Sequence, residues 1–195
     1  MTLNDRSSPL SMLETRRSGR PREMVAPGPT EAELERILTI AARTPDHGKL
    51  SPWRFVIVAP EQRDALAELL ARALPESVPE AGPAHRQKAL DFAHQAPTLV
   101  VLVAAPVPDH KIPLWEQELS VGGAVMNLLH AAHALGFVGS WITGWAAYSD
   151  RVRAALCQPG ERIAGFMFLG TPGVELQERP RPALDTLVRQ WAPPA

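Results

Sequence analysis

Two patterns of apolar residues occur along the chain, one typical of helices and one typical of strands, and the segments that carry them do not alternate strictly. Spacings of three and four residues predict helices that bury one face. Short runs rich in β-branched and aromatic residues predict strands. The predicted helices span residues 9–17, 61–73, 84–96, 115–135 and 150–156, together with one that Thr30 caps and Pro45 ends. The predicted strands span residues 53–59, 99–105, 137–141 and 163–169, and the main loops span 21–29, 75–83, 106–113 and 143–149.

This mixture of elements predicts an α+β domain with a four- or five-stranded sheet between helices. The run at 99–105 is apolar without interruption, so we expect a buried central strand there. The longest helix is apolar on nearly all sides over residues 121–135, which indicates a central core helix. Gly122 and Gly123 weaken that helix. They indicate either the close approach of a partner chain or ordinary packing between helices.

The chain is long enough for one domain with a substantial core, and we assign residues 1–195 to it. Residues 1–8 are predicted to be a flexible N-terminus. Residues 171–195 are predicted to be an extended, proline-rich tail, in which only 184–191 alternates like a strand. Such a tail cannot form a core alone, so we expect its large apolar side chains to be buried on the body of the protein or on a partner.

The composition is typical of a soluble globular protein, with 45% apolar and 21% charged residues. A net charge of −1 leaves no basic excess to neutralise phosphates, which argues against nucleic acid as a partner. The longest apolar run, 98–107, is too short to span a membrane, and residues 1–8 lack the apolar segment of a signal peptide. The single cysteine, Cys157, permits no internal disulfide, which predicts a cytoplasmic location.

Two polar stretches are candidates for a site. Residues 43–54, between a predicted helix and a predicted strand, hold three cations, His47 and a tryptophan; loops fixed between rigid elements often carry sites, and the alternative is a polar connection with ordinary surface charges. Residues 16–20 read Arg-Arg-Ser-Gly-Arg. Guanidinium groups donate paired hydrogen bonds to phosphate and keep their charge. The alternative for this stretch is a solvated basic helix end.

Together with later motifs, these stretches resemble the nitroreductase family of FMN-dependent oxidoreductases, in particular its small single-domain members. The resemblance covers residues 10–187 and rests on the order of several motifs. These are Arg16-Arg17-Ser18, Arg43-x-Pro45-Asp46-His47, Pro52-Trp53-x-Phe55 with the strand residues that follow it up to Val58, Trp115-Glu116-Gln117-Glu118, Gly136-Phe137-x-Gly139-x-Trp141, and Gly165-Phe166-x-x-Leu169-Gly170-Thr171-Pro172. The resemblance implies a central mixed or antiparallel sheet flanked by helices, a long core helix and an intertwined homodimer.

The resemblance also implies a set of cofactor contacts. Arg16, Arg17, Ser18 and Arg20 would contact the phosphate and the pyrimidine edge of FMN. Arg43 and His47 would join them from the other protomer, although a loop histidine in a local hydrogen bond is the alternative for His47. The backbone of Trp141, Ile142 and Thr143 would run along the flavin, and Gly144 would allow a tight turn.

No side chain is assigned a catalytic role, because N5 of the flavin would carry the chemistry. We predict no metal site either, since His130 and His133 lack a third ligand at a suitable spacing and are interpreted as packed histidines. The Trp115–Glu118 motif is assigned no chemistry. A dinucleotide fingerprint is absent, so NAD(P)H would stack transiently on the flavin.

The resemblance therefore implies a homodimeric enzyme that transfers a hydride from NAD(P)H through FMN to a small-molecule acceptor by a ping-pong mechanism, in addition to the cytoplasmic location that the single cysteine predicts. The acceptor would be a nitroaromatic, a quinone or a similar flat electrophile. Two alternatives remain at this point. One is a flavoenzyme of the same fold with other chemistry, such as dehalogenation or ring oxidation, and the other is a flavin-binding protein that serves storage or sensing.

Overall fold

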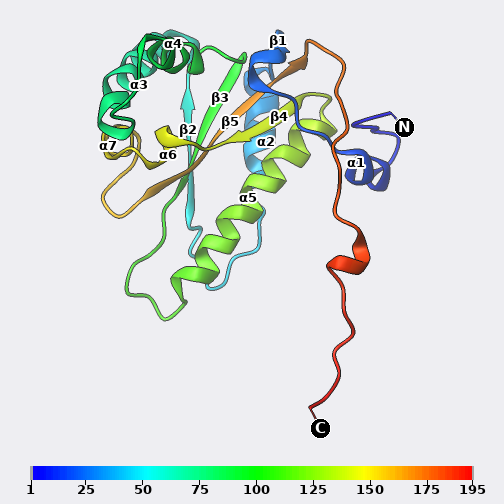
Figure 1. Cartoon of the computed structure of the whole chain (residues 1–195). Helices are drawn as coiled ribbons and strands as arrows, with labels where there is room; N and C mark the ends of the chain where they lie inside the picture. The colour runs from blue at the N-terminus through cyan, green and yellow to red at the C-terminus, as the bar shows by residue number, and fades with distance from the viewer. Residues whose placement is uncertain (1, 195) are drawn as a thin grey trace.

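The computed structural model describes residues 2–194; Met1 and Ala195 lie outside them. Five antiparallel strands form one sheet, and helices cover both of its faces (Figure 1). The strands are β1 Met24–Val25, β2 Trp53–Val58, β3 Thr98–Ala104, β4 Val138–Ile142 and β5 Arg162–Pro172. β5 is the central element, because it pairs with β3, with β4 and, through Thr171 and Pro172, with β1. The predicted α+β class and the number of strands are confirmed.

The helices divide between the two faces. α2 Glu31–Ala41 and α5 Leu114–Ala134 lie on one face, and α3 Arg63–Ser77, α4 Pro83–Phe92, α6 Trp145–Tyr148 and α7 Asp150–Leu156 lie on the other. β3 shows why two cores form: Val100 and Leu102 point to the α2–α5 side, whereas Leu99 and Val101 point to the α3–α4 side. All four side chains are fully buried, as expected of a central strand.

Helix starts follow the predicted caps. Ser8 caps α1 Pro9–Thr15 by accepting a hydrogen bond from the Ser11 N–H at 3.0 Å. Thr30 and Glu33 form the complete capping box of α2. α3 runs through Pro75 to Ser77, beyond its predicted end at residue 73, because a proline in the last turn removes only one helical hydrogen bond.

Two other elements differ from the prediction. β1 lies inside the predicted loop 21–29, and α6 forms one turn inside the predicted loop 143–149. Both are too short to show a periodicity. The strand-like alternation at 184–191 corresponds to no strand: the structure has a 3-10 turn at Leu184–Thr186 there, because the tail lies beside no strand of the described chain with which it could pair.

The two ends of the described chain behave differently. Residues 2–8 fold back on α1, and the Asn4 amide exchanges two hydrogen bonds with the backbone of Arg17. The tail passes along α1 and then projects away from the body (Figure 1). Leu184 is 73% exposed and Trp191 is 77% exposed, so the body of the same chain does not bury them.

The glycine pair in α5 is explained only in part by packing within the chain. A Cβ on Gly123 would lie 2.8 Å from Cγ2 of Thr44, so this glycine admits a residue of the loop after α2. A Cβ on Gly122 would meet nothing within 4 Å among the described residues. Intrachain packing therefore accounts for Gly123, and Gly122 faces open space. Within residues 2–194, no helix is long and apolar enough to cross a membrane.

Candidate functional site

Four arginines gather where the tail crosses the end of α1. Nε of Arg17 donates to the Gln177 carbonyl at 2.7 Å, and Nη2 of Arg181 donates to the Arg16 carbonyl at 3.2 Å. Burial lowers the pKa of Arg16, and the charges of Arg181, Arg17 and Arg179 lower it further. Such a concentration of positive charge suits a phosphate.

The carboxylate of Glu178 pairs with this arginine cluster. Its Oε1 accepts hydrogen bonds from the Arg179 N–H and from Nη2 of Arg181. One negative charge cannot neutralise four guanidinium groups, so the residues present fit a ligand that bears a phosphate. Arg179 and Arg181 were missed by sequence reasoning, although the Arg-Pro-Arg-Pro run at 179–182 was a visible basic signal.

The rest of the Arg16–Arg20 stretch is held against β4. Oγ of Ser18 accepts a hydrogen bond from Nη1 of Arg16 at 3.2 Å. Gly19 packs on Val138 at the start of β4, where a Cβ would lie 3.1 Å from Cγ2 of the valine. Nη1 of Arg20 is 3.0 Å from Oε1 of Glu23, so this exposed arginine already has a partner in the chain.

Trp141, near the other end of β4, lies against β5. Its Nε1 donates to the Ala164 carbonyl at 2.9 Å. A Cβ on Gly165 would overlap the same nitrogen, so the indole rests directly on the glycine. Because Gly165 has no side chain, the indole can lie on β5 and hold Trp141 in place. Trp141 begins the segment that the resemblance places along a flavin.

The following residues turn away from Trp141. Ile142 packs in the core on the α3–α4 side, and Gly144 has a φ of +86°, which favours glycine and starts α6. Thr143 lines a cavity of about 640 Å³ together with the cationic side chains of Arg22 and Lys88. Sequence reasoning missed these two cations, because nothing local connects them with Thr143.

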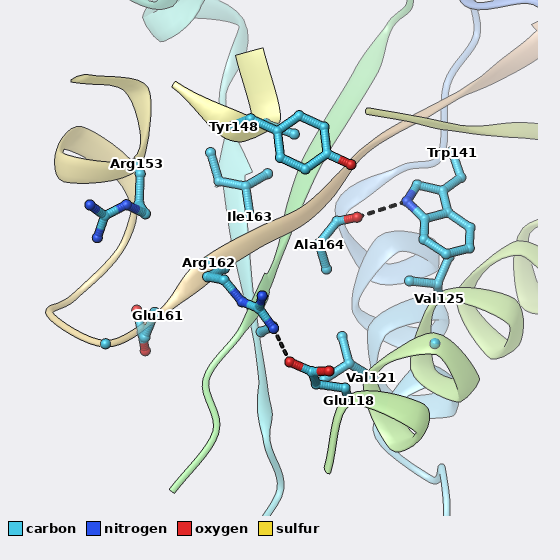
Figure 2. Close-up of a pocket in the computed structure, with 14 residues that line it drawn as sticks. Glu118, Val121, Val125, Trp141, Tyr148, Arg153, Glu161, Arg162, Ile163 and Ala164 are labelled. Carbon is cyan, nitrogen blue, oxygen red and sulfur yellow. Dashed lines mark hydrogen bonds and ion pairs between the residues drawn. The ribbon is translucent and has the colours of Figure 1, made fainter. Parts of the chain in front are cut away.

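A second cavity of about 500 Å³ lies beside Trp141 (Figure 2). α5 contributes Val121 and Val125 to its wall, and β5 contributes Ile163 and Ala164. Tyr148 of α6 overhangs the cavity in Figure 2 and is 79% exposed. The polar edge of the cavity includes the ion pair between Glu118 and Arg162. The cavity is apolar, aromatic at its edge and adjacent to the predicted flavin segment.

Arg43 and His47 lie on a loop docked to the α5 helix. Nδ2 of Asn127 donates to Oγ1 of Thr44 at 2.8 Å, and Nδ1 of His47 lies 2.7 Å from Oε2 of Glu116. Arg43 and His47 are both exposed. The predicted site residues therefore occupy two separate places on one chain.

One place is the loop with His47 and the other is the end of α1 with Arg16, and both lie beside α5. His47 is beside Glu116, near the start of the helix, whereas Arg16 is close enough to His130 for its charge to lower the pKa of that histidine, after the larger effect of burial. A helix rises about 1.5 Å per residue, so residues 116 and 130 are about 20 Å apart. One chain brings Arg16–Ser18 and the 141–144 segment to the two ends of β4, but it does not bring His47 to Arg16.

His133 is a buried core residue, as predicted. Its Nε2 accepts a hydrogen bond from the Gly139 N–H at 3.3 Å, and its Nδ1 has no partner among the described residues. Burial, with smaller effects from Arg16 and His130, lowers the pKa of His133 to about 4. No group of three or more potential ligands that could hold a metal ion occurs among residues 2–194.

Fold and site together define an α+β protein with an arginine cluster at one end of β4 and an apolar cavity beside Trp141 near the other end. The chain belongs to the nitroreductase family, whose sequence profile matches residues 13–171. A Haemophilus influenzae protein named "Putative NAD(P)H nitroreductase" is 38% identical over 179 residues, which cover 91% of this chain and 95% of that protein. The Escherichia coli K12 protein of the same name, YdjA, is 37% identical over 168 residues, covering 84% and 87% of the two chains.

Solved structures agree with this assignment. A nitroreductase-like family protein from Bacillus cereus superposes with a TM-score of 0.79 at 18% identity, covering 94% of this chain and 95% of that one. A nitroreductase with bound FMN from Bacteroides fragilis superposes with a TM-score of 0.70 at 25% identity, covering 91% and 96%. The predicted family and its fold are confirmed.

Proposed function

We propose that this protein is an FMN-dependent NAD(P)H oxidoreductase that reduces nitroaromatics, quinones or similar flat acceptors. The observation that carries the proposal is the arginine cluster at one end of β4, with the Trp141–Gly144 segment at the other end. The names of the Haemophilus influenzae and Escherichia coli relatives support NAD(P)H as the electron donor. The FMN bound to the Bacteroides fragilis relative supports the cofactor.

In this proposal the chain binds and orients the cofactor. Arg16, Arg17, Arg179 and Arg181 would hold its phosphate, and the hydroxyl of Ser18 would add a donor. Backbone of the 141–144 segment would lie along the flavin ring, with Arg20 near its pyrimidine edge. FMN would supply the ability to accept and release a hydride. The protein side chains would contribute alignment and positive charge rather than an acid or a base.

The cavity beside Trp141 (Figure 2) is proposed as the place where donor and acceptor bind in turn. Its apolar walls suit flat rings, and its exposed edge allows exchange with solvent. Binding in turn predicts parallel lines in double-reciprocal plots, the ping-pong pattern. Intersecting lines would show that both substrates bind together.

We further propose a homodimer that completes the site, with His47 and Arg43 reaching the flavin of the partner. Trp115 and Leu119 on α5 are 67% and 56% exposed, an unusual position for large apolar side chains on a core helix. The open edge of β2 and the projecting tail add surfaces that a second copy would cover. The single cysteine supports a cytoplasmic location.

The experiment that tests the proposal is a spectrum followed by turnover. The purified protein should bind FMN in titration and show the absorption bands of an oxidised flavin, and it should oxidise NADH or NADPH when a nitroaromatic acceptor is added. A protein that binds FMN without turnover would have a storage or sensing role. One that turns over other acceptors but no nitroaromatic or quinone would have different flavin chemistry. A protein that binds no FMN would refute the proposal.

A further inference from the structure

The imidazole of His47 has a defined partner on α5. Its Nδ1 lies 2.7 Å from Oε2 of Glu116, in the first turn of that helix. A carboxylate can only accept, so Nδ1 carries the proton and donates it. The other ring nitrogen, Nε2, is then left for a ligand.

The loop that carries His47 is fixed by other contacts. The carboxylate of Asp46 accepts hydrogen bonds from the N–H groups of Leu50 at 3.1 Å and Ser51 at 2.6 Å. Thr44 is anchored on α5 by Asn127. With the backbone held on both sides of His47, rotation of the imidazole is the main remaining freedom, and Glu116 restrains it.

Glu116 and its neighbour Gln117 differ in their burial and in what their side chains bind. The Gln117 side chain is buried and holds the loop before α5, with Oε1 accepting from the Val107 N–H at 2.8 Å and Nε2 donating to the Ile112 carbonyl at 3.1 Å. Glu116 and His47 are 43% and 64% exposed in this chain. Exposed ion pairs contribute little to stability, so the pair is better explained by orientation of the imidazole than by folding.

We infer that Glu116 is a positioning residue that aims Nε2 of His47 at FMN in the site shared with a partner. This inference rests on the proposed function. It also gives a role to the acidic start of the Trp115–Glu118 motif, to which the sequence assigned no chemistry.

The test combines FMN titration with imidazole 15N NMR. Dissociation constants for FMN would be measured for the parent chain, Glu116→Gln, His47→Gln and the double variant. Glu76→Gln is the matched control, because it breaks another exposed ion pair of a glutamate, with Arg151, away from the loop. The His47 15N signals, assigned by their loss in His47→Gln, report which ring nitrogen is protonated.

We expect Glu116→Gln to weaken FMN binding about tenfold and to change the His47 15N signals, without lowering the melting temperature. In the His47→Gln background, Glu116→Gln should have no further effect, and Glu76→Gln should bind FMN like the parent. Equal weakening in both backgrounds, or parent-like binding by Glu116→Gln, would overturn the inference while leaving the proposed function intact. A parent chain that binds no FMN would overturn both.

Discussion

His133 should make the stability of this protein depend on pH in a way that one substitution removes. The residue is fully buried in α5, and its Nε2 accepts the Gly139 N–H only while the imidazole is neutral. Glutamine can also accept that hydrogen bond but does not titrate. His133→Gln is therefore the informative perturbation, because it removes the proton site and can retain the link between α5 and β4.

The magnitude follows from the pKa of His133, which falls from 6.5 to about 4 on folding. Because the folded pKa is depressed, the unfolded chain binds the proton more readily. The associated stability is complete above pH 6.5 and is lost as the pH falls toward 4. Proton linkage then gives a loss of about 2 kcal/mol at pH 5 and about 3 kcal/mol at pH 4 relative to pH 8.

The assay is urea denaturation of the cofactor-free protein at several pH values. Other groups also titrate in this range, including His130, whose pKa is lowered by burial and by Arg16. The relevant quantity is thus the difference between the parent and His133→Gln. Between pH 8 and pH 5, the free energy of unfolding of the parent should fall by about 2 kcal/mol more than that of His133→Gln. A difference that stays constant with pH would refute the reasoning.

Three further changes test the site. Arg16→Gln should weaken FMN binding about ten- to hundredfold in titration without lowering the melting temperature, because it removes a charge that the other arginines repel; parent-like affinity would place the phosphate elsewhere. Gly165→Ala should displace the Trp141 indole and cost about 1–3 kcal/mol in denaturant melts, whereas the control Gly82→Ala, with open space around its Cβ, should cost far less. Truncation after Arg181 should lose the dimer and FMN together, and light scattering that still finds a dimer with bound FMN would contradict the proposed role of the tail.

The sequence was sufficient to predict the main elements of the fold. β3 is apolar almost throughout and the second half of α5 is apolar on nearly all sides, so their patterns alone identify them as core elements. The helix caps at Ser8 and Thr30 are also local signals, because each cap bonds to a residue three positions further on. α6 and β1 could not be found in the same way. A single turn and a two-residue strand are stabilised by their contacts with α3, β5 and the rest of the body, not by a pattern of their own.

For the site, the sequence identified residue types but not their partners. Arg16 and Arg181 are 165 positions apart, and His47 and Glu116 are 69 apart, so no local pattern connects either pair. The strand-like alternation at 184–191 produces no strand for a related reason. Alternation indicates that one face can be buried, but pairing requires an open neighbouring strand, and within the described chain the tail has none.

Whether one chain or two build the flavin site can be decided by mixing variants. The residues of α5 that lie near His47 and Arg16, Glu116 and His130, are about 20 Å apart along the helix, so we expect a flavin that contacts both side chains to take them from different protomers. Homodimers of Arg16→Gln or of His47→Gln then have two defective sites each. In a two-fold dimer, a heterodimer of the two variants has one site with both changes and one site with neither. When a one-to-one mixture is unfolded and refolded together, about half of the dimers should be heterodimers, so about one quarter of all FMN sites should be intact. If each site were built within one chain, every site would still carry one substitution and the mixture would bind no better than its parents.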